Sequence, residues 1–166
     1  MKNDISIAVT GLAWMGTGVG SIESAMDEIF RSATHEILIT SYAISSAADG
    51  VLEWIALSAG RGILIRLAVN KLPDQPHEVK SRLFELNKTY PHFHLYTFAG
   101  SENEDLHAKT IVVDRKYAIV GSSNFSRRGL LTNHELAVVI QGDQAQSIAS
   151  VVDRLFSSQA LNEIEP

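Results

Sequence analysis

The chain has 166 residues, a length that a single hydrophobic core can serve, and its 45% hydrophobic and 20% charged residues are close to globular averages. It contains no cysteine, which excludes disulfides, thiolate metal sites and a thiol nucleophile. The formal net charge of −5 argues against a broad basic surface for nucleic acid, but it still permits a few Lys and Arg gathered in one cleft.

The N-terminal segment MKNDISIAVTGLAWMG has no apolar run long enough for a secretion signal or a membrane-spanning helix. We therefore expect a cytoplasmic protein of bacterial type that does not associate with membranes. No repeat, low-complexity tract or domain linker interrupts the chain, so a single domain over residues 1–166 is predicted.

The first two-thirds of the chain alternate segments typical of strands and helices. A short apolar segment at 5–9 and a glycine-rich stretch precede a helical pattern that Ser21 is placed to cap. The expected order is then helix 21–33, strand 35–44, helix 45–62, strand 63–70, helix 77–90 and strand 92–100. In the second helix Val51, Leu52, Ile55 and Leu57 lie near one side. This alternation favours an α/β domain with a largely parallel sheet and crossover helices.

The last third of the chain has a different pattern. Residues 106–114, 117–124 and 134–142 are strand-like and joined by short turns, which indicates antiparallel hairpins. In the final stretch, 143–161, apolar residues at helical spacing predict a helix that packs on the sheet: Ile148, Val151, Val152, Leu155 and Phe156. The predicted fold is therefore α/β, with a mixed, mostly parallel β-sheet, helices on both faces and C-terminal antiparallel hairpins.

Four polar residues form the most informative cluster. Side chains two apart on a strand share a face, so His107 and Lys109 are expected to project together from one strand. Ser122 and Asn124 are expected to project together from the end of the next strand, after a turn through Gly121. Four polar groups at this spacing can converge on one anion.

The segment HAKTIVVD, six further residues and then GSSN together resemble the phospholipase D superfamily pattern at every defined position. A later strand that carries a carboxylate, here Glu135, extends the resemblance. The single His-x-Lys motif is similar to that of small bacterial dimeric endonucleases of the superfamily. The resemblance implies a phospholipase D-like fold and makes Asp114 and Gly121 structural members of the motif; strand parity also places Asp114 on the face opposite His107.

The chemistry of a phosphodiester assigns roles to these residues. Hydrolysis needs a nucleophile, neutralisation of the non-bridging oxygens and an acid for the leaving oxygen. An imidazole is mostly unprotonated near pH 7, so His107 suits attack on phosphorus, while Lys109 and Asn124 suit neutralisation. Because one histidine cannot attack and protonate at once, the resemblance implies a two-fold homodimer that joins two His107 side chains and forms a phosphohistidine. Glu135 is expected to orient a His107, of either subunit.

This scheme requires no metal or other cofactor. We accordingly predict a metal-independent phosphodiesterase, and above all a non-specific endonuclease that cleaves DNA or RNA. The alternatives are a lipid-directed phospholipase D or transphosphatidylase, and a catalytically idle DNA-tethering or dimerisation module of a larger complex. Arg127 and Arg128 either lie on a solvated turn or bind flanking phosphates.

Other motifs have simpler interpretations. The glycine-rich GTGVG at 16–20 lacks the strand context and partner residues of a nucleotide-binding loop, so a loop before a helix is expected, although it could line the cleft. A zinc site formed by His92, His94 and His107 is conceivable but disfavoured. Trp14 and Tyr42 could stack on bases, whereas core packing is expected for Trp54.

Overall fold

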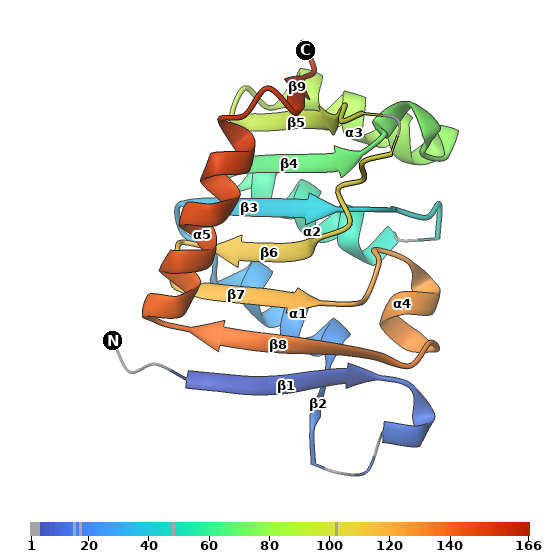
Figure 1. Cartoon of the computed structure of the whole chain (residues 1–166), viewed down its shortest axis with the longest axis vertical. Coiled ribbons are helices and arrows are strands. Elements are labelled where there is room, and N and C mark those ends of the chain that lie inside the picture. Colours follow the sequence, from blue (N-terminus) through green and yellow to red (C-terminus); the bar gives the residue numbers. More distant parts are fainter. Residues whose placement is uncertain (1–3, 15, 17, 48, 102) are drawn as a thin grey trace.

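The computed structural model describes residues 4–14, 16, 18–47, 49–101 and 103–166, which form a nine-stranded sheet with helices on both faces (Figure 1). The strands are β1 (Asp4–Thr10), β2 (Gly20–Ser21), β3 (Glu36–Ser41), β4 (Leu64–Asn70), β5 (Phe93–Phe98), β6 (Lys109–Val113), β7 (Tyr117–Gly121), β8 (Glu135–Gln141) and β9 (Leu161–Glu163). The helices are α1 (Ile22–Ser32), α2 (Asp49–Gly60), α3 (His77–Thr89), α4 (Arg127–Leu131) and α5 (Asp143–Phe156), with short 3-10 turns η1 (Leu12–Trp14) and η2 (Leu72–Asp74). The strand order is β2-β1-β8-β7-β6-β3-β4-β5-β9.

The core consists of two apolar layers, one on each side of the sheet. Strand alternation places Ile39 of β3 in the layer under α1, α2 and α3, and places Leu38 in the layer under α5. Both side chains are fully buried, as expected of a central strand covered on both faces. Helix α4 lies at the edge of the sheet where β3 ends and β6 begins (Figure 1).

Local sequence explains the first helix well. The Ser21 side chain accepts a hydrogen bond from the Ser24 backbone N–H, which confirms the predicted cap. Ile22, Met26 and Phe30 follow at helical spacing, and all three are buried against the sheet. The cap and the apolar stripe therefore specify the same helix.

The α/β class and the helices on both faces are confirmed, but the sheet is less parallel than we expected. Parallel pairing joins β1 to β2, β3 to β4 and β4 to β5, while the other five pairings are antiparallel. The parallel run ends because β6 enters antiparallel beside β3. Antiparallel pairing also joins β1 to β8 and the edge strand β9 to β5.

Two apolar residues predicted to pack inward do not. Leu57 of α2 is 60% exposed and Val151 of α5 is 64% exposed. Small residues take the inward positions of α5, where Ala145 and Ala149 lie fully buried against the sheet. Close packing of this helix thus depends on alanines, which the apolar periodicity of larger side chains does not reveal.

Candidate active site

Lys109 is the first residue of β6, so the strand begins at the site instead of running through it. His107 precedes the strand and is exposed, which corrects the expectation that both residues project from one strand. The two side chains still meet. Lys109 Nζ donates to the His107 backbone oxygen at 2.8 Å and lies 3.0 Å from Nδ1 and 3.2 Å from Nε2 of the imidazole.

The ammonium of Lys109 is held in a partly apolar environment. The residue is 8% exposed, and burial lowers the pKa of its ammonium while the charge of Glu135 opposes that shift. The ring of Tyr42 lies 5.1 Å from Nζ and offers a cation–π contact. A desolvated cation beside an imidazole strongly attracts an incoming anion, because few waters compete for it.

Tyr42 also packs on the imidazole itself. The centroids of the Tyr42 and His107 rings are 4.6 Å apart, with the planes tilted by 55°. Tyr42 directly follows β3, so this strand supplies the aromatic wall of the site. The sequence suggested Tyr42 only as a surface for bases, and nothing in its spacing indicated the contact with His107.

Asn124 lies beyond β7 in a segment that the fold holds closely. Phe125 forms a β-bridge with Ile44, and Gly129 of α4 approaches so near that a Cβ there would lie 2.5 Å from the Asn124 backbone oxygen. The Asn124 side-chain oxygen is buried and has no hydrogen-bond partner among the described residues. Such an unpaired group costs about 1–3 kcal/mol, which a bound ligand can recover.

Gly121 allows β7 and β8 to meet next to this segment. A Cβ at Gly121 would lie 2.7 Å from the Ala137 side chain and 2.8 Å from the Leu136 backbone oxygen. A larger residue would push the strands apart just before Ser122 and Asn124. Glycine at this position of the motif therefore has a packing reason.

Ser122 and Glu135 contact each other. The Ser122 hydroxyl donates to the Glu135 carboxylate, which also accepts from Asn133 Nδ2 at 3.2 Å. Within the described part of one chain neither residue bonds to His107, so the expected Glu135 contact does not form in the single subunit. Ser122 is likewise directed at Glu135 and does not join Asn124.

Asp114 lies past the other end of β6 and faces a different neighbourhood. Its carboxylate accepts from the backbone N–H groups of Thr34, His35 and Glu36 and from the Thr34 hydroxyl, at 2.7–2.9 Å. Burial alone would raise the pKa of this carboxyl, but these hydrogen bonds outweigh burial and lower the pKa. Asp114 therefore ties the β6–β7 turn to the start of β3.

The arginines near the motif divide into two groups. Arg115 pairs with Glu36 at 2.5 Å and with Asp153 at 2.6 Å, at the same end of the sheet as Asp114. Arg127 and Arg128 begin α4 and are exposed at the end of the sheet that carries Asn124. Of these three arginines, only Arg127 and Arg128 lie at the end of the sheet that carries Asn124.

The other candidate motifs lie apart from this site. His92 Nε2 donates to the Ala59 backbone oxygen at 2.8 Å, and His94 Nδ1 lies 2.8 Å from Glu163. No cluster of three or more potential metal ligands occurs among the described residues. Thr17 of the glycine-rich stretch lies outside the described residues. Across the described ranges, no helix has the length and apolarity needed to span a membrane.

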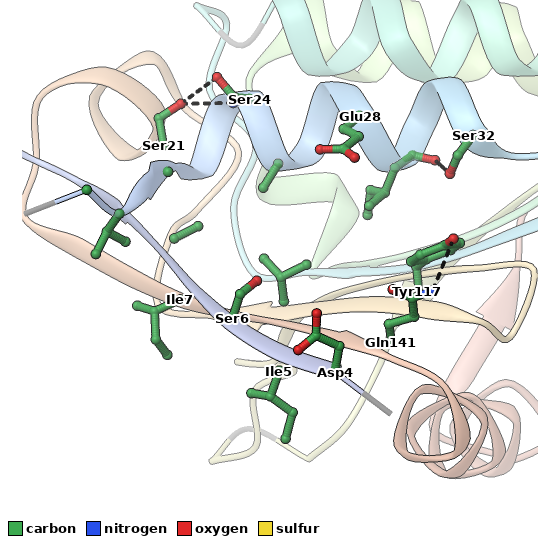
Figure 2. Close-up of a pocket in the computed structure, with 17 residues that line it drawn as sticks. Asp4, Ile5, Ser6, Ile7, Ser21, Ser24, Glu28, Ser32, Tyr117 and Gln141 are labelled. Atoms are coloured by element: carbon green, nitrogen blue, oxygen red, sulfur yellow. Dashed lines mark hydrogen bonds between the residues drawn. The ribbon is translucent and has the colours of Figure 1, made fainter. Parts of the chain in front are cut away.

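Two hollows differ in their relation to the motif. One, of about 720 Å³, lies between β1 and α1, where Ser6, Glu28 and Tyr117 line it (Figure 2). It contains none of the motif residues. The other, of about 600 Å³, includes Tyr42 and Asn124 in its wall and so adjoins the imidazole. Reasoning from sequence indicated neither hollow.

A comparison with known protein families identifies the family to which these motif residues belong. The family described as "Cardiolipin synthase, PLD-like domain" matches residues 26–159, which include the His107, Lys109, Asp114 and Asn124 positions. The chain belongs to this family, and with it to the phospholipase D superfamily.

Three similar proteins illustrate the range of the family. DISARM protein DrmC of Bacillus paralicheniformis is 27% identical over 138 residues, which are 82% of this chain and 57% of DrmC. Cardiolipin synthase A of Edwardsiella ictaluri is 27% identical over 146 residues, 86% of this chain and 29% of that protein. The chain thus spans little more than half, or less, of these relatives. Nuc of Salmonella typhimurium, a phospholipase D family member, has the same fold, with a TM-score of 0.78, 17% identity and coverage of 99% of this chain and all of Nuc.

Proposed function

We propose that the protein is a metal-independent phosphodiesterase that cleaves nucleic acid, with His107 as the nucleophile. The observation that carries this proposal is the placement of the buried Lys109 ammonium within 3.2 Å of both imidazole nitrogens of His107. A phosphate drawn to Lys109 would lie against the imidazole. Asn124 adds an amide donor from the neighbouring segment.

The proposed reaction has two displacements. A His107 nitrogen attacks phosphorus and forms a P–N bond, the P–O bond to the leaving group breaks, and the leaving oxygen takes a proton from the partner subunit's His107. That second imidazole then removes a proton from water, whose oxygen attacks phosphorus and expels His107. Lys109 and Asn124 neutralise the non-bridging oxygens in both steps. One chain supplies only one of the two imidazoles, so the site is complete only in a homodimer.

The sheet offers a surface for this second copy. Helix α5 covers only part of its face, and the strand ends near the site have no helix above them (Figure 1). Ile5 and Ile7 of β1 point away from α1 (Figure 2), and they are 62% and 42% exposed. Exposed Leu136 lies on the same face of the sheet as Ile5 and Ile7, and exposed Val151 lines an apolar hollow whose wall includes Ala108, next to His107. Exposed apolar area of this kind is typical of an interface.

A substitution that introduces a charge at this surface tests the dimer. Val151→Glu should give a monomer in size-exclusion chromatography with light scattering, together with loss of diesterase activity, because a buried unpaired carboxylate is costly. Leu57→Glu is the matched control: an equally exposed apolar residue, on a helix of the opposite face, whose change should affect neither mass nor activity. A monomeric wild type with full activity would contradict the proposal.

Hydrolysis is tested on single-stranded DNA, duplex DNA, RNA and bis(4-nitrophenyl) phosphate in EDTA. Wild type should hydrolyse at least one polymer and the small diester, His107→Ala should hydrolyse none of them, and His77→Ala, a change at an exposed histidine of α3, should behave as wild type. Rapid denaturation at alkaline pH, where the P–N bond of a phosphohistidine survives, should trap a phosphoryl group on the peptide that contains residue 107. Equal activity of wild type and His107→Ala would end the proposal.

A lipid substrate is the second candidate, because one of the relatives is named cardiolipin synthase A. Phosphatidylglycerol vesicles in the same assay distinguish the two. Release of glycerol or formation of cardiolipin at a higher kcat/KM than DNA or RNA cleavage would favour the lipid.

A further inference from the structure

The 600 Å³ hollow beside His107 is formed by segments that follow two adjacent parallel strands. The residues after β3 and the residues at and after the end of β4 supply most of its wall, and the segments before β6 and after β7 close it. The side chains of the wall that can stack on a ligand, pair with its charges or bond to it are Tyr42, Asn70, Lys71, Asp74, Asp105 and Asn124. Pockets of this size suit small molecules or one unit of a polymer.

The hollow adjoins the reacting centre. Tyr42 is shared, since its ring packs on His107 at a centroid distance of 4.6 Å and also lines the hollow. Asn124 is shared as well, and its buried side-chain oxygen lacks a partner among the described residues. A group attached to a phosphate at His107 would therefore enter this space.

Buried amides hold the walls in place. Gln75 Nε2 donates to the backbone oxygens of Tyr42 at 3.2 Å and Asn70 at 2.9 Å, and its oxygen accepts from the Ile44 N–H at 3.0 Å. Asn70 is 3% exposed and accepts from the Leu106 N–H at 2.8 Å. The hollow is thus preformed, and Asn70 links it to the backbone one residue before His107.

The charges of the hollow favour a neutral polar occupant. Lys71 Nζ pairs with Asp105 at 2.9 Å, and Asp74 adds a second carboxylate, so a further phosphate would be repelled. Acyl chains would strip water from these groups without replacing its hydrogen bonds. A nucleoside offers a planar ring for Tyr42, carbonyl acceptors for Lys71 and N–H or O–H donors for the carboxylates.

The backbone at Lys71 is consistent with a binding role. Its φ of 41° lies in the left-handed region, where a non-glycine residue costs of order 1 kcal/mol. Such strain persists only where the surrounding structure fixes the conformation. Here it directs the ammonium to Asp105 at the rim of the hollow.

We infer that this hollow binds the nucleoside on one side of the scissile phosphate, and so makes the site selective for nucleic acid over lipid diesters. The inference rests on the proposed phosphodiesterase function. Tyr42 stacks on the base, Lys71 and Asp105 bond to the polar edge of the nucleoside, and Asn70 holds the segment that leads to His107 against the occupied hollow.

Three small diesters with one leaving group provide the test: methyl 4-nitrophenyl phosphate and the 3′- and 5′-(4-nitrophenyl phosphate) esters of thymidine. Wild type should favour one thymidine ester over the methyl ester by at least about tenfold in kcat/KM. Lys71→Met and Asp105→Asn should each lower that ratio about tenfold. Lys88→Met, a change at an exposed lysine of α3, should leave it unchanged.

The outcomes separate the two proposals. Hydrolysis of none of the three esters by wild type would defeat the phosphodiesterase itself. Equal kcat/KM on all three, or a ratio unmoved by both hollow variants, would overturn the nucleoside site alone. A short-chain phosphatidylglycerol hydrolysed better than either thymidine ester would also overturn it.

Discussion

The two ends of β6 belong to one sequence motif, yet they are built in opposite ways. At the His107 end, Lys109 carries a desolvated charge, and the Asn124 oxygen is buried without a partner in the described chain. At the other end, Asp114 accepts four hydrogen bonds. Unsatisfied groups mark the end where a ligand is expected, and satisfied groups mark the end that holds the fold.

Removing the charge at the first end gives the largest expected effect on activity. Lys109→Met should lower kcat/KM on bis(4-nitrophenyl) phosphate by roughly 10³-fold, because the phosphate loses its main counter-charge. The same change should not lower the free energy of unfolding in urea, since it removes a buried charge that burial disfavours. A marked fall in stability would show that Lys109 belongs to the scaffold.

Removing the carboxylate at the second end should have the converse effect. Asp114→Ala leaves three backbone N–H groups without their acceptor and should cost about 2–4 kcal/mol of unfolding free energy. The kcat of the protein that remains folded should stay within about twofold of wild type. A loss of kcat as large as that of Lys109→Met would contradict the division between the two ends.

The pH dependence of stability sharpens the same contrast. The pKa of Asp114 lies below its ordinary value of 3.8, so its stabilisation is present above that value and is lost as pH falls through the lowered pKa. Wild type should therefore lose stability more steeply than Asp114→Ala between about pH 5 and pH 2. Urea melts at several pH values measure this, and parallel curves for the two proteins would contradict it.

The smallest expected effect is on the alkaline limb of activity. Because burial lowers the pKa of Lys109, the cation needed for phosphate binding is lost at a pH below its ordinary value of 10.5. Lys109→Arg should retain some activity. Its activity should show no decline at alkaline pH from this residue, since guanidinium stays charged. The pH profile of kcat/KM measures both. An alkaline decline that persists unchanged in Lys109→Arg would show that another group causes it.

Sequence alone predicted much of this fold. Apolar periodicity and the Ser21 cap located α1, and buried apolar runs located β3, β4 and the hairpin strands. It did not locate β2, β9 or α4, which have five residues or fewer and no periodicity to read. The parallel share of the sheet was also overestimated, because pairing direction depends on which strands become neighbours far along the chain.

The site was predicted in part, for a related reason. Spacing brought His107, Lys109 and Asn124 to one end of the sheet, because residues that are close in sequence remain close in a hairpin. Tyr42 and Lys71 lie more than 30 residues upstream. Tyr42 reaches the imidazole through the antiparallel pairing of β3 with β6, and Lys71 reaches the adjoining hollow because β4 lies parallel beside β3. No local pattern encodes that proximity.

The turn after β6 determines which side chain faces the site at the other end of the strand. Asp114 and Arg115 both have positive φ, a conformation that glycine or asparagine would adopt more easily, but those residues could not make the bonds to β3 and to Asp153. The turn thereby fixes the alignment of β6 with β3. A slip of one residue would exchange Lys109 with Thr110 and turn the ammonium toward the opposite face. The identity of the phosphate-binding side chain is in this sense decided at a turn that no substrate touches.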